Sequence, residues 1–326
     1  MAKPQSIDGY SAQHTADCER VLATLLRGLG PWGKSVFLVG GLTPRYLIPQ
    51  EPPAVPPHAG TMDVDVVIDL QILADTGAYE TLEANLKRLG FDRAENDDGT
   101  KVSWRWQTKT EHGAKMILEF LADDPCLGGG RVQALPTKGN ISALNIPHSS
   151  MVFDLYEQAE IRAELLDEKG VATVTVKHAD IVSFTCLKAF AHEDRHEPKD
   201  AHDLVYCITH RVEGLDAVAE AFRVQVGGKH GDAVRSALEI LRRRFVDEPG
   251  MEGYQKDGPV AIARFEFGFD TEQREQRALR QREASDAIDR LLKRIELGSK
   301  LESARRMSGQ EDMGGLCAEH GSKCHD

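Results

Sequence analysis

The chain has 326 residues, of which 41% are hydrophobic and 28% are charged, and its formal net charge is −12. This length is sufficient for two domains of ordinary size with hydrophobic cores, and the composition is that of a globular protein. The acidic balance excludes a basic surface that covers the whole chain and binds nucleic acid, although a local basic patch is compatible with it.

The N-terminal residues 1–13 contain no apolar run of the kind found in secretion signals, and no stretch approaches the apolar length of a membrane span. The chain is too long to need disulfides for stability, and four of its six cysteines are scattered singly. We therefore expect a cytoplasmic protein with free thiols and no membrane partner. The cysteines are Cys18, Cys126, Cys186, Cys207, Cys317 and Cys324.

The first part of the chain alternates predicted helices and strands. Residues 15–28 have apolar side chains at helical spacing and predict a helix, whereas the apolar run 35–39 predicts a buried strand. This strand ends at the Gly40-Gly41 turn, and the proline-rich residues 47–60 predict a loop, because proline removes backbone donors. Residues 62–70 predict a second strand with alternating apolar and acidic side chains.

The middle of the chain predicts one helix followed by a pair of strands. Residues 73–89 are expected to form a helix that Gly90 ends. Residues 101–107 and 115–121 predict two strands that can pair as a hairpin, and residues 127–130 predict a glycine-rich loop.

The second half of the chain is expected to be mostly helical. Residues 153–163 fit either a helix or a strand, and the β-branched residues of 172–176 predict a strand. Residues 180–191 and 198–209 predict two helices, the second of which begins at Pro198. Two further helices are predicted over residues 232–246 and 271–297.

These elements predict an α/β (α+β) fold with a helical C-terminal region. Residues 1–150 are expected to form a small mixed sheet flanked by helices, as a catalytic domain. Residues 151–300 are expected to form a mainly helical domain that completes a site in the cleft between the two. Residues 301–326 include a stretch rich in glycine and polar residues, which predicts a flexible tail.

Three acidic residues are candidate metal ligands. Asp63 and Asp65 are two residues apart, so a strand places both carboxylates on one face, while the apolar neighbours anchor the other face. Glu119 lies within an apolar run, where an acidic side chain is costly unless it is paired, exposed or bound to metal. Because magnesium takes carboxylate and phosphate oxygens as ligands, we predict that these residues hold Mg²⁺ or Mn²⁺.

The Gly40-Gly41 pair is a candidate phosphate-binding turn. Without Cβ atoms, the chain can turn sharply and allow phosphates to approach its N–H groups. A Gly-Gly pair alone is most often a plain turn, and an Asp-x-Asp alone can be a solvated strand face. The two motifs in this order, followed by Glu119, favour a nucleoside triphosphate site.

These motifs together resemble the DNA polymerase β-like nucleotidyltransferase superfamily, whose pattern places Gly-Gly or Gly-Ser before an Asp-x-Asp and a later single carboxylate. The gap between the first two motifs is longer here because the proline-rich loop fills it. The resemblance implies that the glycines and Thr61 bind nucleotide, that the aspartates bind metal, and that Glu119 is a metal ligand or a base. It rests on Val39-Gly40-Gly41, Thr61-Met62-Asp63-Val64-Asp65-Val66-Val67 and Glu119.

Residues 186–204 carry a second resemblance, to the Lys…Arg-x3-Lys/Arg-Asp-x2-Asp-Leu block of AbiEii-type nucleotidyltransferase toxins. With the first motifs, the resemblance spans about residues 35–210. A salt-bridged helix hairpin is the alternative explanation of this segment alone, and the upstream aspartates argue against it. The resemblance implies that Lys188 contacts the triphosphate and that Asp203 supports Lys188 or the metal. It implies that Arg195, Lys199 and Asp200 fix the two helices against each other and against the site. Arg195 and Lys199 are also expected to bind the nucleotide.

The implied activity is a magnesium-dependent transfer of a nucleoside monophosphate from a triphosphate to a hydroxyl acceptor, with release of pyrophosphate. The resemblance suggests tRNA or another RNA as acceptor, and it suggests the toxin of a toxin–antitoxin pair, with a cognate antitoxin as partner. A catalytically silent protein of the same fold, acting only as a binding partner, is the second function class. Transfer of label from a nucleoside triphosphate separates the two classes.

Three other patterns have alternative explanations. His192-Glu193-Asp194-Arg195-His196 matches the zinc-protease motif H-E-x-x-H, but its middle residues are charged and Pro198 follows at once, so a solvated helix end is favoured. The C-terminal Cys317, His320, Cys324 and His325 can bind metal, yet they lie in a glycine-rich tail. Arginines over residues 242–244 and 274–282 are suited to RNA, although interleaved acidic residues favour a solvated helix laced with ion pairs.

Overall fold

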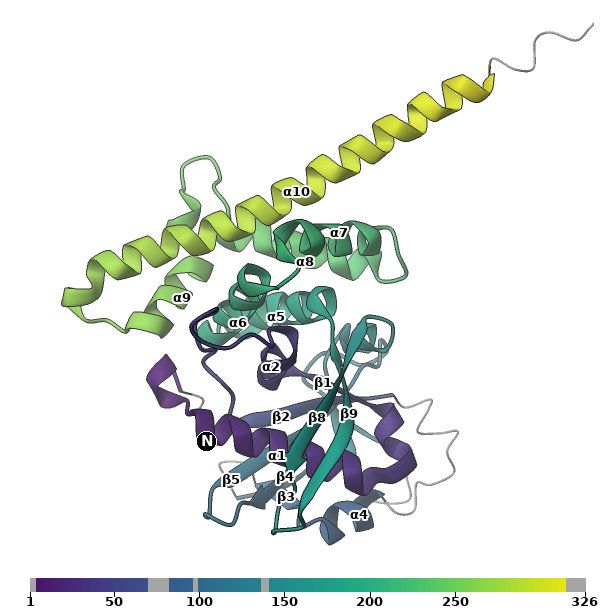
Figure 1. The fold of residues 1–326 in the computed structure, drawn as a ribbon, viewed down its shortest axis with the longest axis vertical. Coiled ribbons are helices and arrows are strands. Elements are labelled where there is room, and N and C mark those ends of the chain that lie inside the picture. The colour runs from purple at the N-terminus through teal and green to yellow at the C-terminus, as the bar shows by residue number, and fades with distance from the viewer. Residues whose placement is uncertain (1–3, 70–81, 96–98, 136–140, 315–326) are drawn as a thin grey trace, which may run out of the picture.

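The computed structural model describes residues 4–69, 82–95, 99–135 and 141–314. A mixed β-sheet forms the centre, with α1 (Ala12–Leu29) and α4 (Leu82–Arg88) on one face. Figure 1 shows the C-terminal helices gathered above the sheet, with the long α10 crossing the top of the molecule. The architecture is therefore a mixed α/β fold with a helical C-terminal region, as the sequence predicts.

Within the described ranges the sheet has nine strands, and seven follow the order β3-β4-β5-β2-β1-β9-β8, while β7 pairs with β5 and β6. Strands β2 and β5, β5 and β7, and β1 and β9 run parallel, and the other pairs are antiparallel. The strands are β1 (Val36–Val39), β2 (Asp63–Ile68), β3 (Asp92–Glu95), β4 (Lys101–Lys109), β5 (Lys115–Ala122), β6 (Val132–Ala134), β7 (Ser142–Asn145), β8 (Tyr156–Glu164) and β9 (Val171–Ala179).

Strand alternation divides the apolar residues between two cores. Val64 and Phe120 belong to the core beneath α1 and α4, whereas Val67 and Leu121 belong to the core beneath the C-terminal helices. Because neighbouring residues of a strand point to opposite faces, the central strands are buried on both sides. The carboxylates of β2 and β5 lie on the face that the C-terminal helices partly cover.

The helical region begins with a hairpin of two helices. Asp180 caps α5, where its Oδ1 accepts from Ser183 N–H at 2.8 Å, and Pro198 occupies the first turn of α6. His196 has a φ of 53°, which ends α5 and reverses the chain. The helices are α5 (Ile181–Arg195), α6 (Pro198–His210), α7 (Gly214–Val226), α8 (Gly231–Phe245), α9 (Asp257–Phe267) and α10 (Arg274–Gly314), and the short α2 (Pro44–Leu47) follows the glycine turn.

Most predicted elements are present, with shifts of a few residues at their ends. The ambiguous residues 153–163 become β8 from Tyr156 onward, because they pair along their whole length with β9. The helix predicted over 73–89 is seen as α4, and its first part lies outside the described residues. Helices α7 and α9 had not been delimited from the sequence.

The sheet continues past residue 150, where the catalytic domain is expected to end. Strands β8 and β9 follow residue 150 in the chain. Because β9 pairs with β1, they extend the sheet to Ala179. The helical region therefore starts at Ile181. Helix α10 continues to Gly314, so the first part of the expected flexible tail 301–326 is helical, and residues 315–326 lie outside the described range.

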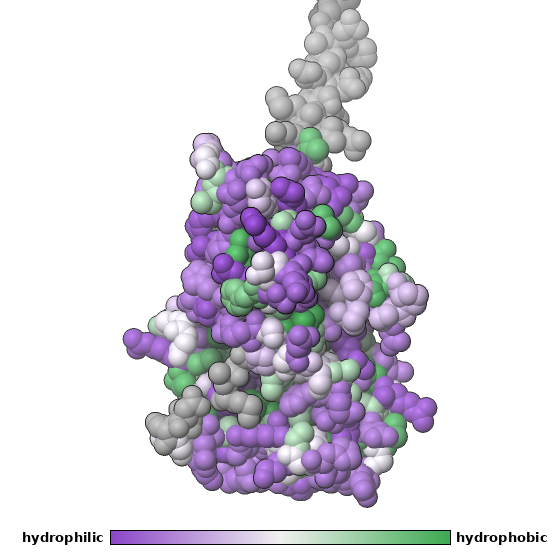
Figure 2. All heavy atoms as spheres, turned by 90° about the vertical axis from the view of Figure 1, so that its left-hand side faces the viewer, coloured by the Kyte–Doolittle hydropathy of each residue, from purple (hydrophilic) through white to green (hydrophobic). Residues whose placement is uncertain are grey.

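None of the helices in the described part of the chain combines the length and apolar character that a membrane span requires. Hydrophilic residues cover most of the face in Figure 2, and hydrophobic residues show in smaller patches across its middle.

Candidate functional site

A pocket lies between the sheet and the α5–α6 hairpin. One side is formed by the glycine turn and by β2 and β5, and the other by α5 and α6. Every residue predicted for the site except Asp203 lines this pocket, which brings together segments separated by more than a hundred residues. The predicted residues that line it are Gly40, Gly41, Thr61, Asp63, Asp65, Glu119, Lys188, Arg195 and Lys199.

Asp63, Asp65 and Glu119 form the acidic floor of the pocket. Oxygen atoms of the three carboxylates all lie within 4.8 Å of one another. The sheet register is the cause, since Asp65 on β2 is directly beside Glu119 on the parallel strand β5. Three carboxylates at such distances repel one another, and a divalent cation among them would offset that repulsion. The residue types and spacing therefore fit a magnesium site.

The two glycines are required by the close approach of other groups. At Gly40, where φ is 71°, a Cβ atom would lie 2.0 Å from Asp65 Oδ2. At Gly41, a Cβ atom would lie 2.6 Å from Thr61 Oγ1 and 3.1 Å from Lys199 Nζ. Both positions would clash with a side chain, so the turn packs directly against the acidic floor and a lysine.

Thr61 positions the first carboxylate of the floor. Its Oγ1 donates to Asp63 Oδ1 at 3.0 Å, and its own N–H donates to Thr15 Oγ1 on α1 at 3.0 Å. Thr61 and Asp63 are both buried, with 2% and 9% of their surfaces exposed. The predicted place of Thr61 in the site is thus explained by its bond to a carboxylate.

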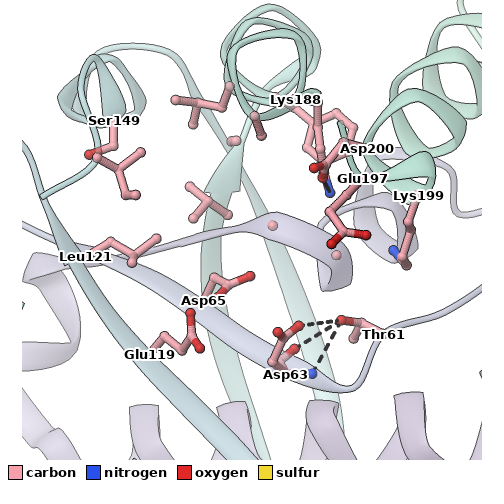
Figure 3. A pocket seen from close by; sticks show the side chains of 18 of the residues that line it. Thr61, Asp63, Asp65, Glu119, Leu121, Ser149, Lys188, Glu197, Lys199 and Asp200 are labelled. Carbon is pink, nitrogen blue, oxygen red and sulfur yellow. Dashed lines mark hydrogen bonds and ion pairs between the residues drawn. The ribbon is translucent and has the colours of Figure 1, made fainter. Parts of the chain in front are cut away.

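The cationic roof of the pocket consists of Lys188 and Arg195 on α5, Lys199 on α6, and the carboxylates that hold them. Lys188 Nζ lies 2.9 Å from Asp200 Oδ1 and 2.7 Å from Asp203 Oδ2. Lys199 Nζ lies 2.7 Å from Asp203 Oδ2, and Arg195 Nε lies 2.7 Å from Asp200 Oδ2. Figure 3 shows Lys188, Asp200 and Lys199 facing the acidic floor from the helical side.

The two buried lysines have pKa shifts of opposite sign. Burial acts to lower the pKa of Lys188, but the nearby Asp200 and Asp203 carboxylates outweigh it, and the pKa is raised. Burial also lowers the pKa of Lys199, and the attraction of Asp203 only partly counteracts it. Burial acts to raise the pKa of Asp203, yet Lys188 and Lys199 hold it well below its usual value. Asp203 is therefore an anion that supports two lysines.

Asp203 does not reach the acidic floor. It is fully buried behind the two lysines, and it is not grouped with the carboxylates of β2 and β5. Of the two roles implied for Asp203, the structure thus places it for support of Lys188, and it adds Lys199 as a second partner.

Arg105 is a residue of the site that the sequence analysis missed. Its Nη2 lies 2.6 Å from Glu119 Oε1, because Arg105 on β4 is directly opposite Glu119 on β5. The predicted hairpin contained the signal, since extending the pairing outward from the turn places residue 105 beside residue 119. Glu119 is consequently shared between an arginine and the acidic floor.

Apolar side chains also line the pocket, and the sequence analysis missed them. The sheet, the segment after β7 and the helix α5 supply its wall, and no spacing pattern marks these residues as a group. A flat, uncharged part of a substrate fits such a wall. The apolar wall is formed by Leu121, Leu144, Ile146, Phe184 and Leu187.

The zinc-protease alternative lacks the required geometry. His192 is buried, whereas His196 is more than half exposed and has left the helix through its positive φ. Glu193 binds Arg243 and Arg244 at 2.7 Å each, which lowers its pKa to about 2 through those hydrogen bonds. The two histidines are absent from the metal-capable groups found among the described residues.

Arginines in both arginine-rich segments form ion pairs with carboxylates. Arg242 binds Glu239 at 3.1 Å, Arg244 binds Glu193, and Arg280 binds Glu266 at 2.8 Å. These pairs agree with the interpretation of solvated, ion-paired helices rather than an RNA surface. The C-terminal Cys317, His320, Cys324 and His325 lie outside the described residues.

A comparison of the chain with models of known protein families gave no match, and a comparison with curated proteins gave none either.

Proposed function

We propose that the chain is a magnesium-dependent nucleotidyltransferase with a sheet of the nucleotidyltransferase type. The observation that carries the proposal is the convergence of Asp63, Asp65 and Glu119 beside a diglycine turn, opposite two buried lysines. An acidic floor that suits a divalent cation and a cationic roof that suits phosphates together match the charge distribution of a metal-bound triphosphate.

In this proposal, each group of residues has its own role. Gly40 and Gly41 allow the triphosphate to approach the backbone, while Lys188 and Lys199 bind its outer phosphates and stabilise the leaving pyrophosphate. Asp63 and Asp65 would hold Mg²⁺ or Mn²⁺, which supplies charge neutralisation at the α-phosphate when bound.

In this proposal, Glu119 acts on the acceptor. In the proposed reaction, an acceptor oxygen forms a bond to the α-phosphorus as the bond to pyrophosphate breaks, and Glu119 accepts the proton of the attacking hydroxyl. The apolar wall offers a surface for an uncharged portion of either substrate. An RNA acceptor and a role as the toxin of a toxin–antitoxin pair belong to the proposal through the resemblance described above.

The test is transfer of label from each of the four α-labelled nucleoside triphosphates, with Mg²⁺, to total RNA, protein or small hydroxyl compounds. We expect transfer by the wild-type chain and a loss of about a thousandfold or more in Asp65→Ala, because metal-held charge stabilisation contributes several kcal/mol. Asp92→Ala, which removes an exposed strand carboxylate, is the matched control and should keep full activity.

Two results would overturn the proposal. The first is full activity in Asp65→Ala. The second is absence of transfer with every nucleotide and acceptor class, which would favour the silent binding protein instead.

A further inference from the structure

The proline-rich residues 47–60 have no part in the site as described so far, although they account for the long gap between the two N-terminal motifs. The segment is held against α6 and its C-terminal end. Tyr206 Oη donates to the Pro56 carbonyl at 2.9 Å, and Arg211 Nη1 donates to the Leu47 carbonyl at 3.2 Å. The segment is therefore a fixed part of the wall behind the cationic roof.

His58 lies near the end of this segment and faces Asp203. Its Nδ1 accepts a hydrogen bond from Gly60 N–H at 3.0 Å, so the ring proton is on Nε2. Nε2 then donates to Asp203 Oδ1 at 2.8 Å. Burial lowers the pKa of His58 to about 4, so the ring is a neutral donor near pH 7. The ring also packs against Tyr206, with centroids 4.9 Å apart.

His58, His202 and Asp203 also form a group whose ligand atoms lie within 4.8 Å of one another. A metal ion does not suit this group. Nε2 of His58 carries a proton, and both oxygens of Asp203 already accept from lysine. The group is better explained as a hydrogen-bond network that fixes the carboxylate.

Asp203 is the common support of the roof. Its carboxylate accepts from Lys188, Lys199 and His58, and 0% of its side chain is exposed. The two lysines are on different helices, so the place of the carboxylate between them sets where both ammonium groups point. His58 is the partner that comes from outside the helix hairpin.

We propose that His58 is a positioning residue that locks Asp203 and, through it, sets Lys188 and Lys199 for the triphosphate. In this proposal, the role of the proline-rich segment is to hold the His58 donor against Asp203, behind the roof. The inference rests on the proposed function, because it assigns the two lysines to phosphate binding.

The test compares two amide substitutions at this position. His58→Gln places an N–H donor where Nε2 lies, and it can still reach Asp203. His58→Asn places its amide near the position of Nδ1, so it can accept from Gly60 but cannot reach Asp203. Both variants remove the ring, and thermal unfolding of each checks that loss of packing on Tyr206 is the same in the two.

The measurements are affinity and kinetics with the full chain. Binding of Mg²⁺-ATP and of the other three Mg²⁺-bound nucleoside triphosphates is measured by calorimetry, and KM for the bound nucleotide is measured in the transfer assay. We expect His58→Asn to raise Kd and KM for the nucleotide about tenfold, since a hydrogen bond to a charged group is lost. KM for the acceptor should stay unchanged, and His58→Gln should restore most of the nucleotide affinity.

The outcomes are separable. Wild-type affinity in His58→Asn, or equal loss in His58→Asn and His58→Gln, would overturn the role of the donor while leaving the proposed function intact. A fall in the amount of active protein with unchanged KM would mean that His58 serves folding alone, which also overturns the inference. Failure of the wild-type chain to bind any of the four triphosphates would overturn the proposed function and this inference together.

Discussion

The floor and the roof of the pocket carry opposite charges and balance them in different ways. In the roof, Lys188 and Lys199 are buried against Asp203, so the charges compensate one another within the protein. In the floor, Asp63, Asp65 and Glu119 crowd together, and Arg105 pairs with Glu119. The charges of the roof are thus balanced without a ligand, whereas a bound cation would offset the repulsion among the floor carboxylates.

This difference predicts that removing a charge will have different consequences in the two places. A roof carboxylate holds buried cations, so its loss leaves them without compensation. The floor carboxylates repel one another, so the loss of one relieves that repulsion and should cost function more than stability. Substitutions that preserve shape but remove charge separate these effects.

Asp203→Asn should have the largest effect on stability. We expect a loss of about 3–5 kcal/mol in the free energy of unfolding, because breaking a buried pair from one side leaves an uncompensated charge. Denaturant unfolding measures the loss, with the exposed Asp194→Asn on α5 as a control that should be neutral.

The pH dependence sharpens the same prediction. The folded-state pKa of Asp203 lies well below its unfolded value, so its stabilisation is present above about pH 4 and is lost as the pH falls further. The difference between wild type and Asp203→Asn should therefore narrow on acidification below pH 4. If Asp203→Asn lost less than 1 kcal/mol in the free energy of unfolding at pH 7, the lysines would have found other partners. The roof and the floor would then not differ in how the loss of a charge affects stability.

The sequence was sufficient to identify the floor because the signal there is local. The alternation of β2 places Asp63 and Asp65 on one face, and the apolar run around Glu119 predicts the neighbouring strand. The fold class followed from the same patterns, since each strand and most helices have their own periodicity.

Long-range contacts account for what the sequence did not reveal. His58 sits in an irregular segment, and its partner is 145 residues away, so no periodicity marks it. The pairing of β9 with β1, with Leu38 opposite His178, is likewise a long-range contact that no local pattern reveals. The apolar wall of the pocket likewise comes from separate segments that only the fold unites.

Divalent cations should have the next largest effect, and they act on the floor alone. At a concentration of Mg²⁺ about a hundred times its Kd, we expect the free energy of unfolding of the wild type to rise by about 2.7 kcal/mol. Asp65→Asn should show no such rise, because it lacks one carboxylate of the proposed cation site. Thermal unfolding with and without Mg²⁺ measures both. Equal stabilisation of the two proteins would place the cation elsewhere.

Arg105→Gln should have the smallest effect. It tests how much of the negative charge of the floor is already balanced by the protein. Arg105 lies on the neighbouring strand, forms an ion pair with Glu119 and adds a positive charge close to the proposed metal site. Its removal lowers the repulsion felt by an incoming cation. We expect the Mg²⁺ affinity to rise about twofold to fivefold, which is about 0.4–1 kcal/mol and lies within the range typical of such partly exposed pairs.

Calorimetric titration of Mg²⁺ measures the change, and Arg93→Gln is the matched control. Arg93 lies on the neighbouring strand β3 but binds Glu83 of α4 on the opposite face of the sheet, so its loss should leave Mg²⁺ affinity unchanged. Weaker Mg²⁺ binding in Arg105→Gln would mean that the arginine holds Glu119 in place for the cation. In that case the floor, like the roof, would depend on an internal counter-charge for its geometry.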